Sequence, residues 1–213
     1  MSVETKERLI TAAGTVLRTQ GYGKASARTI AKEADVNSAL IFYHFGGVDP
    51  LLLAALDRSS AERMERHTAT VADARTLEEL AERATRIYRD DLDGGHITLL
   101  SELVAAAVAK PELREEIRIR VEPWLAFMEE TLERVIGGTP LARLTPPRDL
   151  ANAAVTFYLG VNLFTVLDAD RSRTESVFAM VRRLAPRAKL LTLRSPVRFG
   201  RARGFGKARG ATG

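Results

Sequence analysis

Side chains that could carry out acid–base chemistry are scattered along this chain of 213 residues. Adjacent carboxylates occur at four places, Glu78-Glu79, Asp90-Asp91, Glu115-Glu116 and Glu129-Glu130. Neighbouring residues on a helix point about 100° apart, so none of these pairs forms a catalytic dyad by its spacing alone. We therefore interpret the pairs as parts of solvated helix faces.

The three histidines are also isolated from one another. We expect His67 on a solvated face, His96 at the mouth of a pocket near a helix start, and His44 on a short helix considered below. The sequence has no cysteine, no His-Glu-x-x-His pattern and no other paired ligand spacing. These patterns predict no catalytic residue, no metal site and no cofactor.

Charge is distributed unevenly along the chain. The formal net charge is +5, but residues 1–50 carry only +1, residues 51–186 carry −4, and residues 187–213 carry eight basic and no acidic side chains. Six of the basic residues lie between Arg194 and Arg209, interleaved with Phe199 and Phe205. This basic tail, residues 187–213, is predicted to be disordered alone and could contact phosphates without sequence preference.

The elements that position these residues are predicted to be helices throughout. Apolar residues recur at helical spacing, and no alternating β-branched run suggests a strand. We expect about nine helices, near residues 3–20, 27–34, 37–45, 49–70, 76–92, 97–109, 111–136, 148–168 and 172–185. Pro123 should kink or split the long helix over 111–136 and open space for a cavity beside Trp124.

No segment suggests export or membrane insertion. The most apolar stretch, Ala153–Leu167, is about 15 residues long and is interrupted by polar residues, which is too short to span a bilayer. The N-terminus lacks the pattern of a signal peptide. With no cysteine, a soluble cytoplasmic protein without a membrane partner is expected.

The first three predicted helices form a compact unit. Ser26 can cap the second helix, Asp35 occupies a turn, and Asn37 can cap the third helix. Asp49-Pro50 is typical of an N-cap followed by proline at the first helical position, where a fourth helix would begin. Two short helices joined by a tight turn indicate a helix-turn-helix, whose second helix can enter a DNA major groove.

The stretch from Ser26 to Phe45, behind a helix that ends at Gly21-Tyr22, resembles the DNA-binding domain of the tetracycline-repressor (TetR) family. The resemblance covers about residues 5–55. It implies an all-α, homodimeric transcription factor, usually a repressor, that binds a palindromic double-stranded DNA operator and is released by a small-molecule effector. It also places packing positions at Ile30, Ala31, Val36, Leu40 and Phe45.

The same resemblance identifies the residues expected to contact DNA. Tyr43 and His44 match phosphate contacts, whereas Arg28, Ser38 and Ala39 are better placed for base edges. The full predicted DNA-binding set is Ser26, Arg28, Thr29, Asn37, Ser38, Ala39, Phe42, Tyr43 and His44.

Three positions depart from the family pattern. Phe42 stands where tyrosine is common, Val48 where a phosphate-binding lysine is usual, and Asp35 where glycine is usual. Aspartate tolerates the left-handed backbone of such a turn better than most residues. The other two changes remove a hydroxyl and a cation, so we expect weaker electrostatic anchoring to DNA than is usual.

The C-terminal helices contain no specific motif, and the family resemblance implies their roles. Residues that could line an effector pocket are His96, Leu99, Leu100, Leu103, Trp124, Phe127, Met128 and Phe157. Residues that could pair across a two-fold axis, as two helices from each protomer, are Ala151, Ala154, Tyr158, Gly160, Val161, Phe164, Phe178, Val181 and Leu184.

The sequence thus predicts a helix-turn-helix domain over residues 1–48, a helical ligand-binding and dimerisation domain over 49–186, and the basic tail. Its predicted function is a TetR-like regulator, not an enzyme. Two alternatives remain open: a helical enzyme or small-molecule carrier with a vestigial helix-turn-helix, and a general nucleic-acid binder acting through the tail.

Overall fold

The computed structural model describes residues 2–165, 167 and 171–192, and within them it contains helices and no strand. The predicted all-α class is confirmed. The α-helices are α1 (Ser2–Gln20), α2 (Ala27–Ala34), α3 (Ala39–Phe45), α4 (Val48–Val71), α5 (Leu77–Gly94), α6 (His96–Ala109), α7 (Pro111–Ile136), α8 (Pro140–Leu144), α9 (Pro147–Thr165), α10 (Ser172–Leu184) and α11 (Lys189–Thr192). Two 3-10 turns, Tyr22–Lys24 and Ala185–Ala188, complete them.

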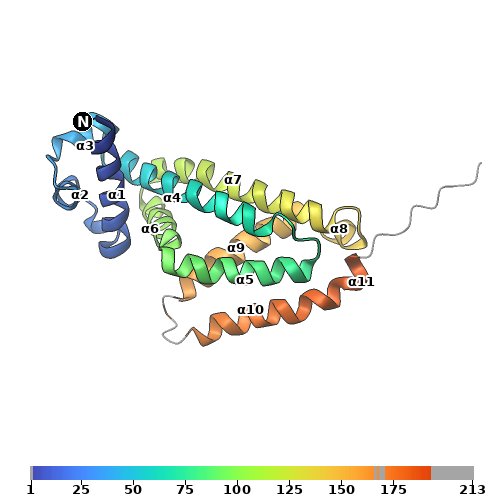
Figure 1. Ribbon diagram of the computed structural model, residues 1–213. Helices are drawn as coiled ribbons and strands as arrows, with labels where there is room; N and C mark the ends of the chain where they lie inside the picture. The colour runs from blue at the N-terminus through green and yellow to red at the C-terminus, as the bar shows by residue number, and fades with distance from the viewer. Residues whose placement is uncertain (1, 166, 168–170, 193–213) are drawn as a thin grey trace, which may run out of the picture.

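The helices are arranged as a small unit at one end of an elongated bundle. Figure 1 shows α1, α2 and α3 in blue at that end, with α4, α5, α7 and α10 running away from them. Helix α6 crosses between the two parts and packs against α1 as well as against α7 and α9. Helix α6 is therefore shared by both parts of the molecule, as is α4, which packs against α1, α3 and α7.

The first helices form because their apolar residues face one core. Ile30, expected at a packing position, is fully buried, and so are Leu9 and Val16 of α1. Buried residues of α4 and α6, such as Leu52 and Leu103, continue the same core without a break. Apolar burial of this kind contributes about 1.5–3 kcal/mol for each large side chain. The helix-turn-helix unit is thus packed onto the bundle through a shared core, and is not connected to it by a linker alone.

Several boundaries differ from the sequence prediction. Helix α8 occupies a stretch expected to be a loop, because the Thr139 hydroxyl accepts from Ala142 N and Pro140 stands at the first helical position. The sequence predicted a kink or a split at Pro123, and α7 is not split there but runs through the proline as one helix. Buried residues on both sides of the proline, including Leu113 and Leu132, hold the two halves in one helix.

The predicted tail begins inside described structure. Residues 187–192 belong to the second 3-10 turn and to α11, so helical structure continues past the boundary expected at residue 187. Residues 193–213, which carry six of the basic side chains, lie outside the described residues. Within the described ranges, no single helix has both the length and the apolar character that a membrane span requires.

Candidate functional site

The turn between α2 and α3 is built from local hydrogen bonds. As predicted, the Ser26 hydroxyl caps α2 by accepting from Thr29 N at 3.1 Å. Asp35 adopts the left-handed conformation, with φ of 51° and ψ of 53°, and the Arg8 guanidinium donates to the Ala34 carbonyl at 2.6 Å. The N-cap of α3 is Ser38 and not Asn37 as predicted, and Asn37 Oδ1 instead accepts from Ala39 N at 2.8 Å within the turn. These contacts set the angle at which α3 leaves the turn.

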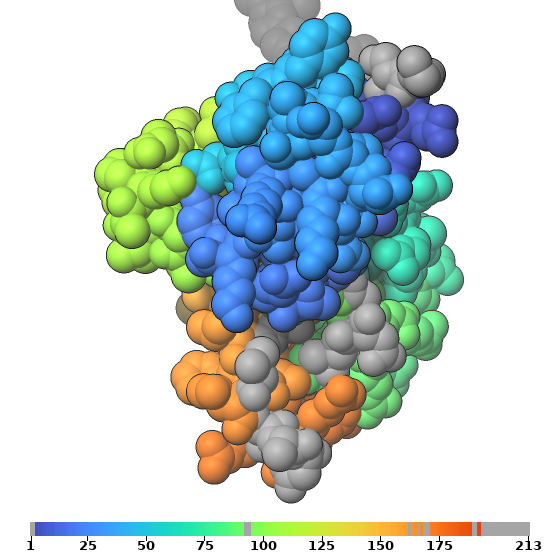
Figure 2. Space-filling view, turned by 90° about the vertical axis from the view of Figure 1, so that its left-hand side faces the viewer, coloured from blue at the N-terminus to red at the C-terminus, as the bar shows by residue number. Residues whose placement is uncertain are grey.

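The structure leaves most of the predicted DNA-binding residues accessible on the surface of this unit. Tyr43 is 81% exposed and Phe42 is 58% exposed, which is unusual for aromatic side chains in a folded domain. Thr29 and His44 are half-buried. The other exposed members of the set are Ser26, Arg28, Asn37, Ser38 and Ala39. Figure 2 shows this end of the molecule, where N-terminal segments in blue form the front of the surface.

One departure from the family pattern has a structural consequence. Val48 begins α4 and is a half-buried residue packed against the N-terminal core. A lysine there would present its cation at the edge of the same unit, whereas valine adds apolar contact. Asp49 does not cap α4 as predicted, because the N-cap is Gly47. The Asp49 carboxylate is instead engaged by Tyr22 and Lys110.

A cavity of about 520 Å³ lies within the C-terminal bundle. Helices α4, α5, α6, α7, α9 and α10 all contribute to its walls, which are mostly apolar. Of the eight predicted pocket residues, six line it: His96, Leu100, Trp124, Phe127, Met128 and Phe157. Leu99 and Leu103 are instead buried in the core shared with α1. They lie on the face of α6 that is turned away from the cavity lining.

One side of the cavity carries a polar cluster that sequence reasoning missed. Arg63 and Asp91 form an ion pair, and each is only 3% exposed. Tyr158 donates its hydroxyl hydrogen to Asp91, and His67 Nε2 lies 3.2 Å from the same carboxylate. The expected solvated positions of His67 and Asp91 are therefore wrong. The signal in the sequence was a four-residue spacing on α4, which puts Arg63 and His67 on the same helix face as the apolar Val71. Polar side chains on an apolar face indicate a buried polar cluster.

The two cavity histidines are neutral at physiological pH. Burial, followed by the nearby Arg63 and Arg66, lowers the pKa of His67 from 6.5 to about 4. Burial, followed by Arg63 and His67, lowers the pKa of His96 from 6.5 to about 3. His96 is thus a buried wall residue and not a residue at the cavity mouth. Its Nδ1 lies 2.9 Å from the Ser59 hydroxyl, and its ring lies 5.9 Å from that of Trp124.

Helix α6 is bonded to the turn that precedes the helix-turn-helix. The Tyr22 backbone N–H donates to Glu102 Oε2 at 2.7 Å. The Tyr22 hydroxyl donates to Asp49 at 2.7 Å, and the Lys110 ammonium donates to the same carboxylate at 2.8 Å while lying 5.3 Å from the centre of the Tyr22 ring. Because Lys110 separates α6 from α7, this cluster joins four segments. Hydrogen bonds to Asp49 and Tyr22 raise the pKa of Lys110.

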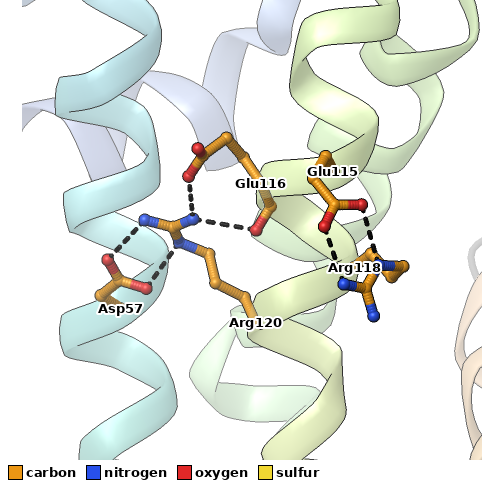
Figure 3. Close-up of polar contacts among 5 residues, drawn as sticks. All are labelled: Asp57, Glu115, Glu116, Arg118 and Arg120. Atoms are coloured by element: carbon orange, nitrogen blue, oxygen red, sulfur yellow. Dashed lines mark hydrogen bonds and ion pairs between the residues drawn. The ribbon is translucent and has the colours of Figure 1, made fainter.

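A second set of ion pairs fixes α4 against α7 beside this junction. Figure 3 shows the Arg120 guanidinium reaching across to Asp57 on α4 while it also contacts Glu116 on its own helix. Arg118 and Glu115 pair within α7. Glu115 and Arg118 are exposed, so their pair contributes little to stability. The carboxylate pair Glu115-Glu116 is thus engaged in surface ion pairs, as its solvated-face interpretation suggested.

The residues expected at a dimer interface fall into different environments in the single chain. Ala151, Val161 and Phe178 are buried within the protomer. Ala154, Tyr158, Val181 and Leu184 line the cavity, as Phe178 also does. Phe164 is 66% exposed, and open space surrounds the position where a Cβ on Gly160 would lie. Other exposed apolar residues of α9 and α10, not singled out from the sequence, are Leu163 and Met180.

The described residues offer no group of three or more His, Asp or Glu side chains arranged to hold a metal ion. What they do offer is an exposed short helix after a tight turn, and a large apolar cavity in the bundle on which this unit packs. The two are joined by the Tyr22, Glu102, Asp49 and Lys110 contacts. This arrangement can present one surface to a macromolecule while enclosing a small molecule elsewhere.

Comparison with known proteins places this arrangement in a family. Residues 9–55 match the family model of bacterial regulatory proteins of the tetR family. An uncharacterised HTH-type transcriptional regulator of Mycobacterium tuberculosis is 30% identical over 144 residues, which cover 68% of this chain and 74% of the relative. The match therefore extends well beyond the helix-turn-helix into the bundle.

Solved structures show the same fold. A TetR-family regulator from Cytophaga hutchinsonii superposes with a TM-score of 0.73 at 18% identity, over 87% of this chain and 94% of that one. The multidrug binding protein EbrR, complexed with imidazole, superposes with a TM-score of 0.60 at 30% identity, over 86% and 90%. From the matched helix-turn-helix, the relative and the shared fold, the chain belongs to the TetR family of transcriptional regulators.

Proposed function

We propose that this protein is a homodimeric repressor that binds a palindromic operator and is released by a small molecule held in the cavity. Helix α6 carries the proposal. It contributes His96, Ile97 and Leu100 to the cavity wall, and its Glu102 holds the turn that leads into the helix-turn-helix. A change in the position of α6 on ligand binding would therefore move the unit that contacts DNA.

The DNA contact is proposed for α3 and the start of α2. Each protomer would place α3 in a major groove, with Arg28, Ser38 and Ala39 toward base edges and Tyr43 toward phosphates. Two such helices related by a two-fold axis require half-sites about one helical turn, or a multiple, apart. The exposure of Tyr43 and Arg28 supports this assignment, because exposed side chains meet DNA without rearrangement of the core.

The dimer contact is proposed for the outer faces of α9 and α10. Leu163, Phe164 and Met180 are exposed there. Burial of such side chains against a second copy would remove apolar surface from water, which is the main driving force for association. Gly160 would let the two α9 helices approach closely, because nothing within 4 Å occupies its Cβ position.

The effector acts by its difference in affinity for two dimer geometries. It binds more tightly when the two α3 helices no longer match the operator spacing, and DNA weakens ligand binding by the same factor. The structural neighbour EbrR, described as a multidrug binding protein and complexed with imidazole, supports a ligand-binding role for a bundle of this fold.

Footprinting on the DNA upstream of the protein's own gene tests the proposal. The expected result is one protected palindrome, lost with Tyr43→Ala, and increased expression of a reporter driven by that DNA when the regulator is absent. The matched control is Leu144→Ala, which truncates an exposed apolar side chain on α8, away from α3. A uniform, sequence-independent protection pattern, or none at all, would contradict operator binding.

A further inference from the structure

The charged groups at the cavity form one ion pair, Arg63 with Asp91, beside which Arg63 Nε is buried without a hydrogen-bond partner. Asp91 is the only carboxylate among the described residues that line the cavity, and none of those residues is Lys or Arg. The carboxylate is paired with Arg63, which lies behind the wall, and also accepts from Tyr158. The positive and negative charges cancel inside the protein. No charge at the wall is left for a ligand to neutralise.

The two histidines offer hydrogen bonds without charge. A carboxylate can only accept, so His67 Nε2 carries the hydrogen that faces Asp91, and Nδ1 of the neutral ring is then an acceptor. His96 uses Nδ1 toward the Ser59 hydroxyl, which leaves Nε2 as its second polar atom. Both rings pack against Trp124 and both line the cavity. The remaining lining is almost entirely apolar or aromatic.

We propose that the ligand of this cavity is an uncharged, largely apolar molecule with one hydrogen-bonding group, which lies against His67 and His96 while its apolar body fills the space beside Trp124, Phe127 and Met128. A volume of about 520 Å³ is within the range of pockets that enclose a drug-sized molecule. The inference rests on the proposed function only in naming this ligand as the effector.

A charged ligand is disfavoured by the cost of burying an unpaired ion. An isolated carboxylate or ammonium loses its hydration in an apolar cavity, and this loss is repaid only by a partner of opposite charge. Here a carboxylate ligand would have to compete with Asp91 for Arg63, and an ammonium ligand would have to compete with Arg63 for Asp91. An uncharged hydroxyl or carbonyl group needs neither exchange.

Three probes with one apolar body and different head groups test the proposal. 4-Octylphenol is neutral at pH 7.5, 4-octylbenzoate is an anion and 4-octylbenzylammonium is a cation. Titration calorimetry of the full-length protein at pH 7.5 should give a Kd for 4-octylphenol at least tenfold lower than for either charged probe. Binding of a charged probe as tightly as 4-octylphenol, or no binding of 4-octylphenol, would overturn the proposal.

Variants of the ion pair connect the preference to its cause. Asp91→Asn leaves Arg63 without its counter-charge, so the preference should reverse and 4-octylbenzoate should bind at least tenfold more tightly than to the wild type. Asp90→Asn is the matched control, because Asp90 is the exposed neighbour of Asp91 on α5, and it should keep the wild-type order. An unchanged order of affinities in Asp91→Asn would count against the argument.

A second variant covers the case in which Asp91→Asn does not fold. Arg63→Met with Asp91→Asn removes both charges together, which is often tolerated where removal of one partner is not. This double variant should still prefer 4-octylphenol, and a preference for a charged probe would refute the charge argument. Calorimetry needs no DNA, so the two experiments are independent. The absence of a protected operator would not change the measured ligand preference, and the absence of the ligand preference would not change the footprint.

Discussion

The Glu102 carboxylate accepts a hydrogen bond from the backbone N–H of Tyr22, with 2.7 Å between the two heavy atoms. The contact joins residues 80 positions apart in the sequence. It ties the middle of α6 to the turn that starts the helix-turn-helix. Gly21, with φ of 77°, brings this turn close to Glu102, because a Cβ at residue 21 would lie 3.1 Å from the carboxylate oxygen.

Removal of this acceptor should destabilise the protein. Glu102→Ala leaves the half-buried Tyr22 N–H without its partner, which should cost about 1–3 kcal/mol of unfolding free energy. Glu102→Gln, which keeps an acceptor oxygen, should lose less. Urea denaturation measures both. Glu115→Ala removes a carboxylate whose ion pair is exposed and screened by solvent, so it should leave stability nearly unchanged. Equal losses for Glu102→Ala and Glu115→Ala would contradict the role of the contact.

Stability should fall on acidification because of His96. Its pKa is about 3 in the folded protein and near 6.5 when unfolded, so below pH 6.5 the unfolded state binds the extra proton. Stabilisation by the neutral ring is therefore present above pH 6.5 and is lost progressively as the pH falls toward 3. At pH 5 the loss should be about 2 kcal/mol, from 1.36 kcal/mol for each pH unit below 6.5.

His96→Gln isolates this contribution, because glutamine does not titrate. Between pH 7.5 and pH 5 the unfolding free energy of both proteins should decrease. The decrease should be about 2 kcal/mol smaller in the variant than in the wild type. His44→Gln is the matched control, since His44 is half-buried on α3 away from the cavity. His96 is preferred to His67 for this test, because a His67 variant would also remove the ring that lies 3.2 Å from the Asp91 carboxylate. Parallel pH profiles for wild type and His96→Gln would exclude this origin of the acid sensitivity.

Arg28→Ala should weaken operator binding and relax sequence preference together. Loss of a base-edge contact by arginine costs about 1–3 kcal/mol, which is roughly a ten- to hundredfold increase in Kd. Fluorescence anisotropy with the footprinted operator and a scrambled duplex would separate the two effects. Arg118→Ala, on the exposed surface of α7, should leave both affinities unchanged. If Arg28→Ala weakened binding to both duplexes equally, Arg28 would be a phosphate contact.

Phe164→Glu should convert the proposed dimer to a monomer. The Phe164 side chain is 66% exposed on α9, so a glutamate there would be solvated in a monomer. In a dimer that covers this position, the same charge would be buried without a partner. Sedimentation velocity over a concentration series measures the change. Val108→Glu is the matched control, because Val108 is 80% exposed on α6. A dimer that persists unchanged in Phe164→Glu would move the interface elsewhere.

Deletion of residues 193–213 should lower DNA affinity without changing operator preference. The segment carries six basic residues and no acidic ones, and each phosphate that it neutralises adds to the dependence of binding on salt. The truncated protein should bind operator and random DNA more weakly and with a shallower salt dependence. Anisotropy titrations at salt concentrations from about 50 to about 300 mM measure how the DNA affinity depends on salt. Identical slopes would refute a role for the segment.

Local chemistry made the N-terminal unit predictable. Ser26 caps α2, Asp35 takes the left-handed turn and Asn37 bonds the start of α3, and each of these contacts spans only a few residues. The burial of Leu9 and Ile30 also followed from helical spacing. Such features depend on neighbours within one or two turns of chain, so the order of residues is enough to specify them.

The polar cluster was not predictable in the same way. A charged residue on a helix has the same local pattern whether it faces water or an opposite charge on another helix. Asp91 could be placed only once α5 was packed against α4, where Arg63 lies. Asp49 shows the same limit, because a capping pattern in the sequence gave way to distant partners, Tyr22 and Lys110.

The sequence by itself determined the all-α class and the helix-turn-helix, because caps, turns and apolar periodicity act within short stretches of chain. Only the tertiary structure decided which apolar residues of α9 and α10 face the cavity and which face outward. Both groups have helical spacing, and only the packing of α9 against α6 and α7 separates Tyr158 from Phe164. The tertiary structure also decided the charge balance of the cavity, because Arg63 of α4 and Asp91 of α5 meet only when the two helices pack together.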